Sequence, residues 1–220
     1  MSISPSPATI NAPPADCQIC PRLALFREEC QAKYPRYHNA PVPSFGPVDA
    51  PLLIVGLAPG MHGANQTGRP FTGDYAGDLL YATLDKFCFS TGQYDQRPDD
   101  GLVLTGCRIT NAVRCLPPQN KPETKEIANC RPYLKGEFDG MPQLRIILAL
   151  GLIAHKSVLA GFGLKQNAVP FIHGQLAEIQ TGMALISSYH CSRYNTNTGR
   201  LTTPMFEDVF STITQHLSAS

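Results

Sequence analysis

The sequence predicts an α/β fold in which helices cover both faces of a parallel sheet. Segments of strand character alternate along the chain with segments of helical composition, which is the pattern of parallel strands joined by crossover helices. Residues 52–55 are also continuously apolar, as expected of a strand that is buried on both faces. A long glycine-rich loop follows this strand, and such loops inside compact domains are usually functional.

The elements can be assigned in order. The expected strands are residues 52–55, 102–110, 145–150 and 183–188. The expected helices are residues 22–33, 75–89, 123–138, 152–159 and 204–217, with Pro132 bending or ending the third. We expect an extended connector over residues 34–50, no helix or strand over 56–73, and irregular structure over 161–175. The loops after the first, second and fourth strands should meet at one sheet edge, where ligands bind.

Composition limits the domain organisation and the class of function. The 220 residues, 43% of them hydrophobic, suffice for one domain with a substantial core, which we assign to residues 16–220. Residues 1–15 are rich in Ser, Pro and Ala and are expected to form a disordered tail. The formal net charge of +1 argues against an indiscriminate nucleic-acid binder, although it leaves room for a local basic patch.

The chain shows neither a signal peptide nor an apolar stretch long enough to span a membrane, so we expect a cytoplasmic protein without membrane contact. Its eight cysteines are then metal ligands or buried thiols rather than disulfides. Cys17 and Cys20 form a CxxC pair, and Cys115 and Cys130 form a wider pair. Spacing alone leaves an iron–sulfur cluster, a structural zinc and unligated thiols open. The other four, Cys30, Cys88, Cys107 and Cys191, are expected to be buried.

The glycine-rich loop matches neither a Walker A sequence nor GxGxxG, so it implies no nucleotide cofactor. By spacing alone it is a ligand loop of an α/β protein or a surface loop with structural glycines. Four motifs together are more specific. These are GLAPG at residues 56–60, TGRPFTGD at 67–74, PPQNKP at 117–122 and HCSRYNTNTGR at 190–200.

In this combination and order the motifs resemble the uracil-DNA glycosylase superfamily, and within it the fifth family, the UDGb type. The resemblance implies a three-layer α/β/α sandwich around a four-stranded parallel sheet. It implies a monofunctional, monomeric enzyme that removes uracil from DNA, with hypoxanthine or xanthine as further substrates. It also implies a structural [4Fe–4S] cluster on Cys17, Cys20, Cys115 and Cys130.

The resemblance also implies residue roles, each with a structural alternative. Phe71 would stack on an extruded base, or be a core Phe. Asp74 would position water, or cap a helix. His190 would lie beside the base O2, or be a buried histidine with a backbone partner. Asn120 would lie near the sugar or base, or be a turn-forming Asn. The residues implied around the base are Gly56, Ala58, Gly60 and Asn111. The residues implied to contact DNA, or else to form an ordinary solvated loop, are Ser192, Arg193, Tyr194 and Asn195.

One departure from the wider superfamily affects the expected chemistry. Ala58 stands where many members carry Asp, Asn or Glu, although alanine there is typical of the fifth family. A non-catalytic iron–sulfur module that binds DNA or senses damage is therefore an alternative, and so is a hydrolase of free nucleotides on the same scaffold. A relative that traps DNA covalently is disfavoured, because residues 60–74 contain no basic insert that ends in a histidine.

Overall fold

The computed structural model describes residues 12–219 and confirms the α/β fold. The main sheet has five strands in the order β4-β1-β5-β7-β6, and the first four are parallel. The four predicted parallel strands correspond to β1 (Leu52–Gly56), β4 (Cys107–Asn111), β5 (Ile146–Leu150) and β7 (Met183–Ser188). The fifth, β6 (Leu176–Gln180), pairs antiparallel with β7 at the sheet edge and was not predicted.

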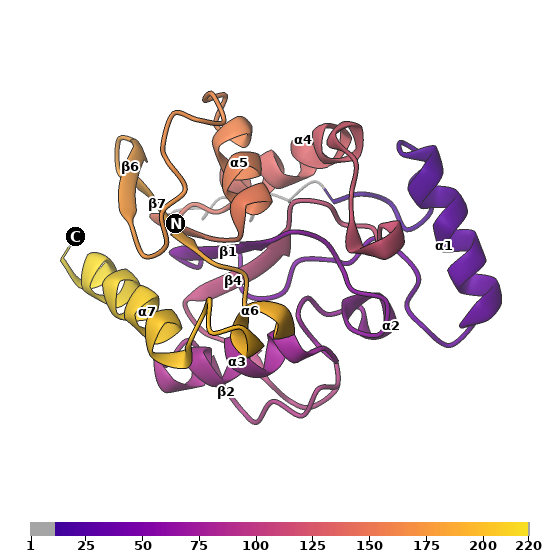
Figure 1. Ribbon diagram of the computed structural model, residues 1–220, viewed down its shortest axis with the longest axis horizontal. Coiled ribbons are helices and arrows are strands. Elements are labelled where there is room, and N and C mark those ends of the chain that lie inside the picture. The colour runs from indigo at the N-terminus through magenta and orange to yellow at the C-terminus, as the bar shows by residue number, and fades with distance from the viewer. Residues whose placement is uncertain (1–11, 220) are drawn as a thin grey trace, which may run out of the picture.

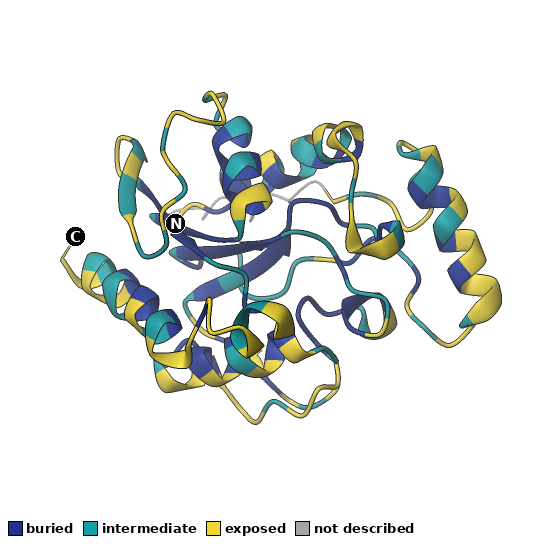
Figure 2. Ribbon diagram, in the orientation of Figure 1, coloured by how far each residue is buried: buried dark blue, intermediate teal, exposed yellow. Residues whose placement is uncertain are grey.

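Helices cover both faces of this sheet (Figure 1). One face carries α4 (Thr124–Gly140) and α5 (Leu152–Gly161), and the other carries α3 (Tyr75–Lys86) and α7 (Thr203–Ser218). The sheet between them is buried (Figure 2), which explains why its central strands are continuous apolar runs. Helix α1 (Pro21–Lys33) stands at the side of the sandwich and exposes much of its surface.

The predicted second strand is wrong in its extent. Residues 102–110 form two strands, because Gly106 adopts a left-handed conformation with φ of 74° between them. The first, β3 (Val103–Leu104), pairs with β2 (Ser90–Thr91) in a separate two-stranded sheet, and only β4 joins the main sheet. The loop between β2 and β3 thereby becomes a hairpin tip beside α3.

Two helix predictions also need correction. Helix α4 continues through Pro132 to Gly140. Pro132 and Ala128 are both exposed, so the carbonyl that loses its helical partner at this point can be hydrated. The glycine-rich loop contains one helical turn, α2 (Ala64–Thr67), which ends at the left-handed Gly68. Two further short elements follow strands, η1 (Pro118–Asn120) and α6 (Arg193–Asn197).

A buried group of charged side chains around Glu137 connects several elements near the loop after β4. Glu137 of α4 accepts hydrogen bonds from Arg108 at 2.7 Å, from Arg114 at 2.5 Å and from the Ser44 hydroxyl. Arg114 also donates to the backbone oxygen of Val42. The carboxylate therefore links the connector before β1, strand β4 and helix α4.

Two further sequence predictions concern the N-terminal tail and membrane-spanning segments. Residues 1–11 of the expected disordered tail lie outside the described part of the chain, so for them it stays a prediction. Of the described residues 12–15, Pro13 lines the small cavity that contains four cysteines, and Pro14 accepts a hydrogen bond from the Cys17 backbone N–H at 3.0 Å. Among residues 12–219, no helix is both long and apolar enough to cross a bilayer.

Candidate active site

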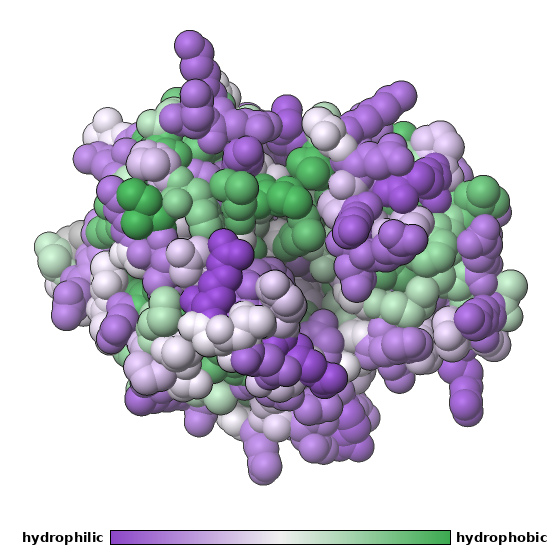
Figure 3. Space-filling model, in the orientation of Figure 1, coloured by the Kyte–Doolittle hydropathy of each residue, from purple (hydrophilic) through white to green (hydrophobic). Residues whose placement is uncertain are grey.

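A cavity of about 340 Å³ opens at the carboxyl ends of the parallel strands. Its walls come from the loops after β1, β4 and β7, which confirms that these loops meet at one sheet edge. Figure 3 shows the molecule from the side on which the central surface is hollowed, with apolar side chains above the hollow. The predicted site residues that line the cavity are Ala58, Gly60, Phe71, Asp74, Asn111, Asn120, His190, Ser192 and Arg193.

The floor of the cavity depends on a close approach at Gly56. Gly56 is the register partner of Asn111 across the β1–β4 pairing. A Cβ on Gly56 would collide with the Asn111 side-chain oxygen and come within 2.7 Å of the Phe71 ring. Glycine is therefore required here for packing, although it does not itself line the cavity.

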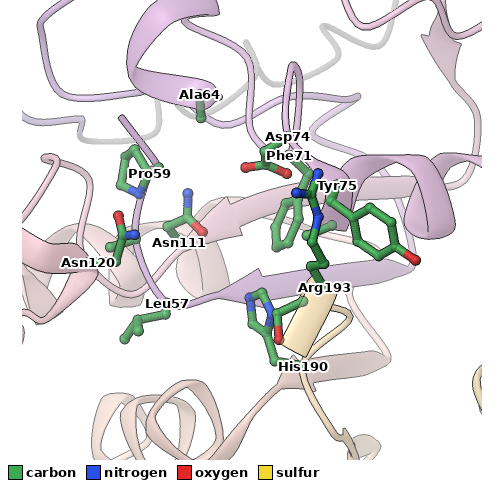
Figure 4. Close-up of a pocket in the computed structure, with 14 residues that line it drawn as sticks. Leu57, Pro59, Ala64, Phe71, Asp74, Tyr75, Asn111, Asn120, His190 and Arg193 are labelled. Atoms are coloured by element: carbon green, nitrogen blue, oxygen red, sulfur yellow. The ribbon is translucent and has the colours of Figure 1, made fainter. Parts of the chain in front are cut away.

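Asn111 and Phe71 offer complementary surfaces to a planar ligand. Asn111 is 3% exposed, and its amide has no hydrogen-bond partner among residues 12–219. Because Asn111 lines the cavity, its amide oxygen and its NH₂ group can both form hydrogen bonds with a ligand there. Phe71 is 7% exposed, and its ring lies 6.0 Å from the His190 ring with an interplanar angle of 29°. Figure 4 shows these side chains around the same space.

Asp74 caps helix α3, which was the structural alternative for this residue, and it also lines the cavity. One carboxylate oxygen accepts a hydrogen bond from the Gly77 backbone N–H at 3.2 Å and caps α3. The other oxygen lies against Gly63 and Gly60, where a Cβ would approach it to 2.5 and 3.4 Å. Burial raises the pKa of Asp74, and the N–H groups at the helix start oppose that shift. Capping and chemistry are therefore compatible at this residue.

His190 follows β7 and is held as a neutral imidazole. Burial lowers its pKa from 6.5 to about 4, because the protonated ring would lose its hydration. Its ring makes no hydrogen bond within the described residues, so the alternative of a satisfied backbone partner is not observed. A neutral imidazole keeps one N–H donor and one acceptor nitrogen for a ligand.

The loop after His190 is a compact cap over one side of the cavity. Ser192 caps α6 and lines the cavity together with Arg193. The Asn195 side chain donates to the backbone oxygen of His190 at 2.8 Å, so it closes the loop on itself. Tyr194 projects away from the protein and is 72% exposed. The predicted DNA contacts of these four residues stay predictions.

Asn120 reaches the cavity through strained backbone. Gln119 and Asn120 are both left-handed, with φ of 56° and 57°, in the η1 turn. Asparagine tolerates this conformation better than most residues, so the turn-forming role is real. Its side chain nevertheless lines the cavity opposite Asp74 and Arg193 (Figure 4).

Sequence reasoning missed several cavity residues. Leu57, Pro59, Ala64, Tyr75 and Ala76 line it as well. The Arg193 guanidinium lies 5.1 Å from the centre of the Tyr75 ring, so the loop after β7 contacts the start of α3. Apart from adjacency to Asp74, no sequence signal identifies Tyr75, because the contact joins segments far apart in the chain.

The four cysteines of the expected ligand set line a second, small cavity. Cys17, Cys20, Cys115 and Cys130 surround it together with apolar side chains such as Leu23. None of the eight cysteines forms a disulfide, and Cys30, Cys107 and Cys191 are buried as predicted. The prediction for Cys88 is wrong, because it is exposed after the end of α3. Over residues 12–219, no three His, Cys, Asp or Glu side chains are grouped closely enough to hold one metal ion.

Comparison with known proteins identifies the family. Residues 43–214 match the model of the uracil DNA glycosylase superfamily. The chain belongs to this superfamily. It is 44% identical over 198 residues to a type-5 uracil-DNA glycosylase of Thermus thermophilus, covering 88% of this chain and 90% of the relative. It is 42% identical over 209 residues to a type-5 uracil-DNA glycosylase of Mycobacterium leprae, covering 91% of each.

A more distant similarity places the chain within the superfamily. It is 31% identical over 161 residues to a type-4 uracil-DNA glycosylase of Pyrobaculum aerophilum, covering 70% of this chain and 73% of the relative. The type-5 relatives above are more similar over more of the chain. The resemblance to the fifth family predicted from the four motifs is confirmed.

The first testable consequence concerns the charge of His190. We expect its imidazole to remain neutral from about pH 8 to about pH 5, because burial lowers its pKa to about 4. The unfolded chain takes up this proton near pH 6.5, so this residue's contribution to folding stability is present above that value and is lost as the pH falls towards 4. Nitrogen NMR of labelled protein, assigned with His190→Gln, measures the midpoint. A midpoint at the ordinary value would contradict the buried, neutral ring.

Proposed function

We infer that the protein is a uracil-DNA glycosylase, which hydrolyses the N-glycosidic bond of uracil in DNA and leaves an abasic site. The observation that carries this conclusion is the convergence of Phe71, Asn111, Asp74 and His190 on one cavity in a member of this superfamily. A base inside a duplex cannot reach such a cavity, so the nucleotide must be extruded from the helix.

The cavity supplies binding groups suited to a pyrimidine. The Phe71 ring offers a face for stacking, a contact worth about 1–3 kcal/mol per base in single-strand binders. The unpartnered Asn111 amide can donate and accept hydrogen bonds at the base edge. The small Ala58 side chain occupies the wall where a larger polar group would take up space. We propose on this ground that hypoxanthine and xanthine are also accepted.

Cleavage of the bond between the base nitrogen and the sugar C1′ leaves the electron pair on the base and positive charge on the sugar. The neutral His190 can donate its N–H to the developing charge on the base oxygen. The backbone N–H groups of Leu57, Ala58 and Gly60, which line the cavity, can act in the same way. The Asp74 carboxylate would stabilise the sugar cation and orient the water that adds to C1′. As the new C–O bond forms, this water would pass its proton to Asp74, and the released base anion would take up a proton from solvent.

The loop after β7 would hold the DNA. Ser192 and Arg193, at the cavity mouth, are placed to contact phosphates, and contacts of this kind need no large net charge. The exposed Tyr194 ring would enter the space left by the extruded nucleotide. Asn195 would support this loop through its bond to the His190 carbonyl.

The function is tested by single-turnover incubation with labelled duplexes that carry one uracil, hypoxanthine or xanthine, followed by alkali cleavage at abasic sites. We expect breaks only at the modified position. His190→Ala should lower the rate about a hundredfold or more, because loss of one such donor in other enzymes costs roughly 2.7–4 kcal/mol. A loss below about threefold would remove His190 from the mechanism.

Folded wild-type protein that releases no base would favour the binding-module alternative, provided that it still binds the duplex. Release from nucleoside monophosphates but not from DNA would favour the free-nucleotide alternative. The same assay therefore decides among the three functions.

Asp74→Asn separates capping from chemistry. Asparagine caps helices about as well as aspartate, so we expect the thermal unfolding temperature to change little. Loss of the negative charge should slow base release about a hundredfold. Asp78→Asn, which changes an exposed carboxylate one turn further along α3, is the matched control and should keep the wild-type rate. An unchanged rate with Asp74→Asn would assign this residue to capping alone.

We propose that Cys17, Cys20, Cys115 and Cys130 hold a [4Fe–4S] cluster. Their common cavity and the absence of disulfides support this ligand set. Burial raises the pKa of Cys115 to about 12, so a thiolate at this place needs a cationic partner. A bound cluster would connect the start of α1 to the loop after β4 and to α4.

Iron and sulfide analysis of anaerobically purified protein tests the cluster. We expect about four irons per chain and a broad visible absorption band. Cys115→Ser should lower the iron content and the thermal unfolding temperature, whereas Cys88→Ser, at an exposed thiol outside the cavity, should change neither. Stoichiometric zinc, or no metal in folded protein, would contradict the proposal.

A further inference from the structure

Phe71 holds its place in the cavity through an unfavourable backbone conformation. Its φ of 54° lies in the left-handed region, which side chains other than glycine rarely adopt. Such conformations persist only where the surroundings enforce them, and they concentrate at functional sites. The groups that enforce this one lie behind the cavity wall and are not part of the mechanism described above.

Arg69 connects the residues on both sides of Phe71. Its Nε donates to the Thr72 hydroxyl at 2.7 Å, which draws together the chain before and after Phe71. Its two terminal nitrogens donate to the two oxygens of Asp100 at 2.8 and 2.6 Å. The two side chains are 6% and 1% exposed, so this bidentate pair is shielded from water.

Two tyrosines complete the enclosure. The Tyr81 hydroxyl donates to the Pro70 carbonyl at 2.6 Å, and the Tyr94 hydroxyl donates to the Phe71 carbonyl at 3.1 Å. The Arg69 guanidinium carbon lies 5.5 and 5.8 Å from the centres of these two rings. Both peptide groups that flank Phe71 are thus held by side chains that do not line the catalytic cavity.

Asp100 and Tyr94 both belong to the hairpin loop between β2 and β3, in which most of the other residues are exposed. Besides Arg69, its carboxylate accepts from the backbone N–H groups of Asp95 and Leu102, both at 3.0 Å. Hydrogen bonds within the hairpin therefore hold the Asp100 carboxylate in the position in which it accepts from Arg69. The hairpin is thus connected through Asp100 and Arg69 to the loop that contains Phe71.

We propose that Arg69 and Asp100 are positioning residues that hold Phe71 in the left-handed conformation in which its ring forms the wall of the base pocket. The proposal rests on the function proposed above and adds the hairpin tip to the parts of the chain that determine activity. Neither residue would touch the substrate. Their effect on base release would pass through Phe71.

The proposal is tested with Asp100→Asn, which removes the charge and weakens the bidentate contact with little change in volume. At a temperature where thermal unfolding shows the variant fully folded, we expect the single-turnover rate on uracil to fall about ten- to a hundredfold, because small misplacements of positioning groups cost this much. Asp99→Asn, at a neighbouring carboxylate that is 78% exposed, is the matched control and should keep the wild-type rate.

A double-mutant cycle separates positioning through Phe71 from general weakening of the protein. Phe71→Ala combined with Asp100→Asn should be no slower than Phe71→Ala alone, because the second change has nothing left to position. Effects that multiply, or a wild-type rate for Asp100→Asn, would overturn the proposal. If Asp100→Asn fails to fold, Arg69→Lys takes its place, since lysine keeps the charge but cannot form the bidentate contact.

A spectroscopic measurement keeps this test independent of the proposed activity. In protein with labelled phenylalanine, the Phe71 ring resonance should shift in Asp100→Asn and stay in place in Asp99→Asn, because the ring would leave its position against His190. An unchanged resonance would overturn the positioning role even if the enzyme is active. A shifted resonance in a protein that releases no base would uphold the role and refute the proposed function alone.

Discussion

The parallel pairing of β1 with β4 is the constraint on which the site depends. Its register sets Gly56 opposite Asn111 at the last step of the two strands, so the two loops leave the sheet side by side. The missing side chain at Gly56 then allows the Phe71 ring and the Asn111 amide to approach each other. A shift of one residue would turn Asn111 away from the cavity, because successive side chains on a strand point to opposite faces.

The five residues from Asn111, at the end of β4, to Cys115 contribute to both cavities and to the core between them. Asn111 faces the catalytic cavity, Arg114 turns inward to Glu137, and Cys115 faces the cysteine cavity. Arg114 and Glu137 are each 1% exposed at their side chains, and removing one partner of such a pair leaves an uncompensated buried charge. This ion pair therefore anchors the two cavities to a common point in the core.

Several residues that line the cavity also have a structural role. Asp74 caps α3 with one oxygen, places the other near Gly60 and Gly63, and lines the cavity. Asn120 occupies a left-handed turn position and lines the cavity. From the sequence these roles looked like competing interpretations. The geometry reconciles them, because a helix start or a tight turn at the carboxyl edge of a sheet directs its polar side chain towards the ligand.

The sequence by itself determined the layered α/β fold, the four parallel strands and the loops that meet above them, because continuous apolar runs and glycine-rich breaks are local signals. It did not reveal β6, an edge strand with partly exposed side chains, or the helical turn α2 inside the glycine-rich loop. Tertiary structure alone decided the pairing of Arg69 with Asp100 and the neutral state of His190. Both depend on burial and on contacts between segments that are far apart in the sequence. Neither produces a repeating pattern of residue types from which it could be predicted.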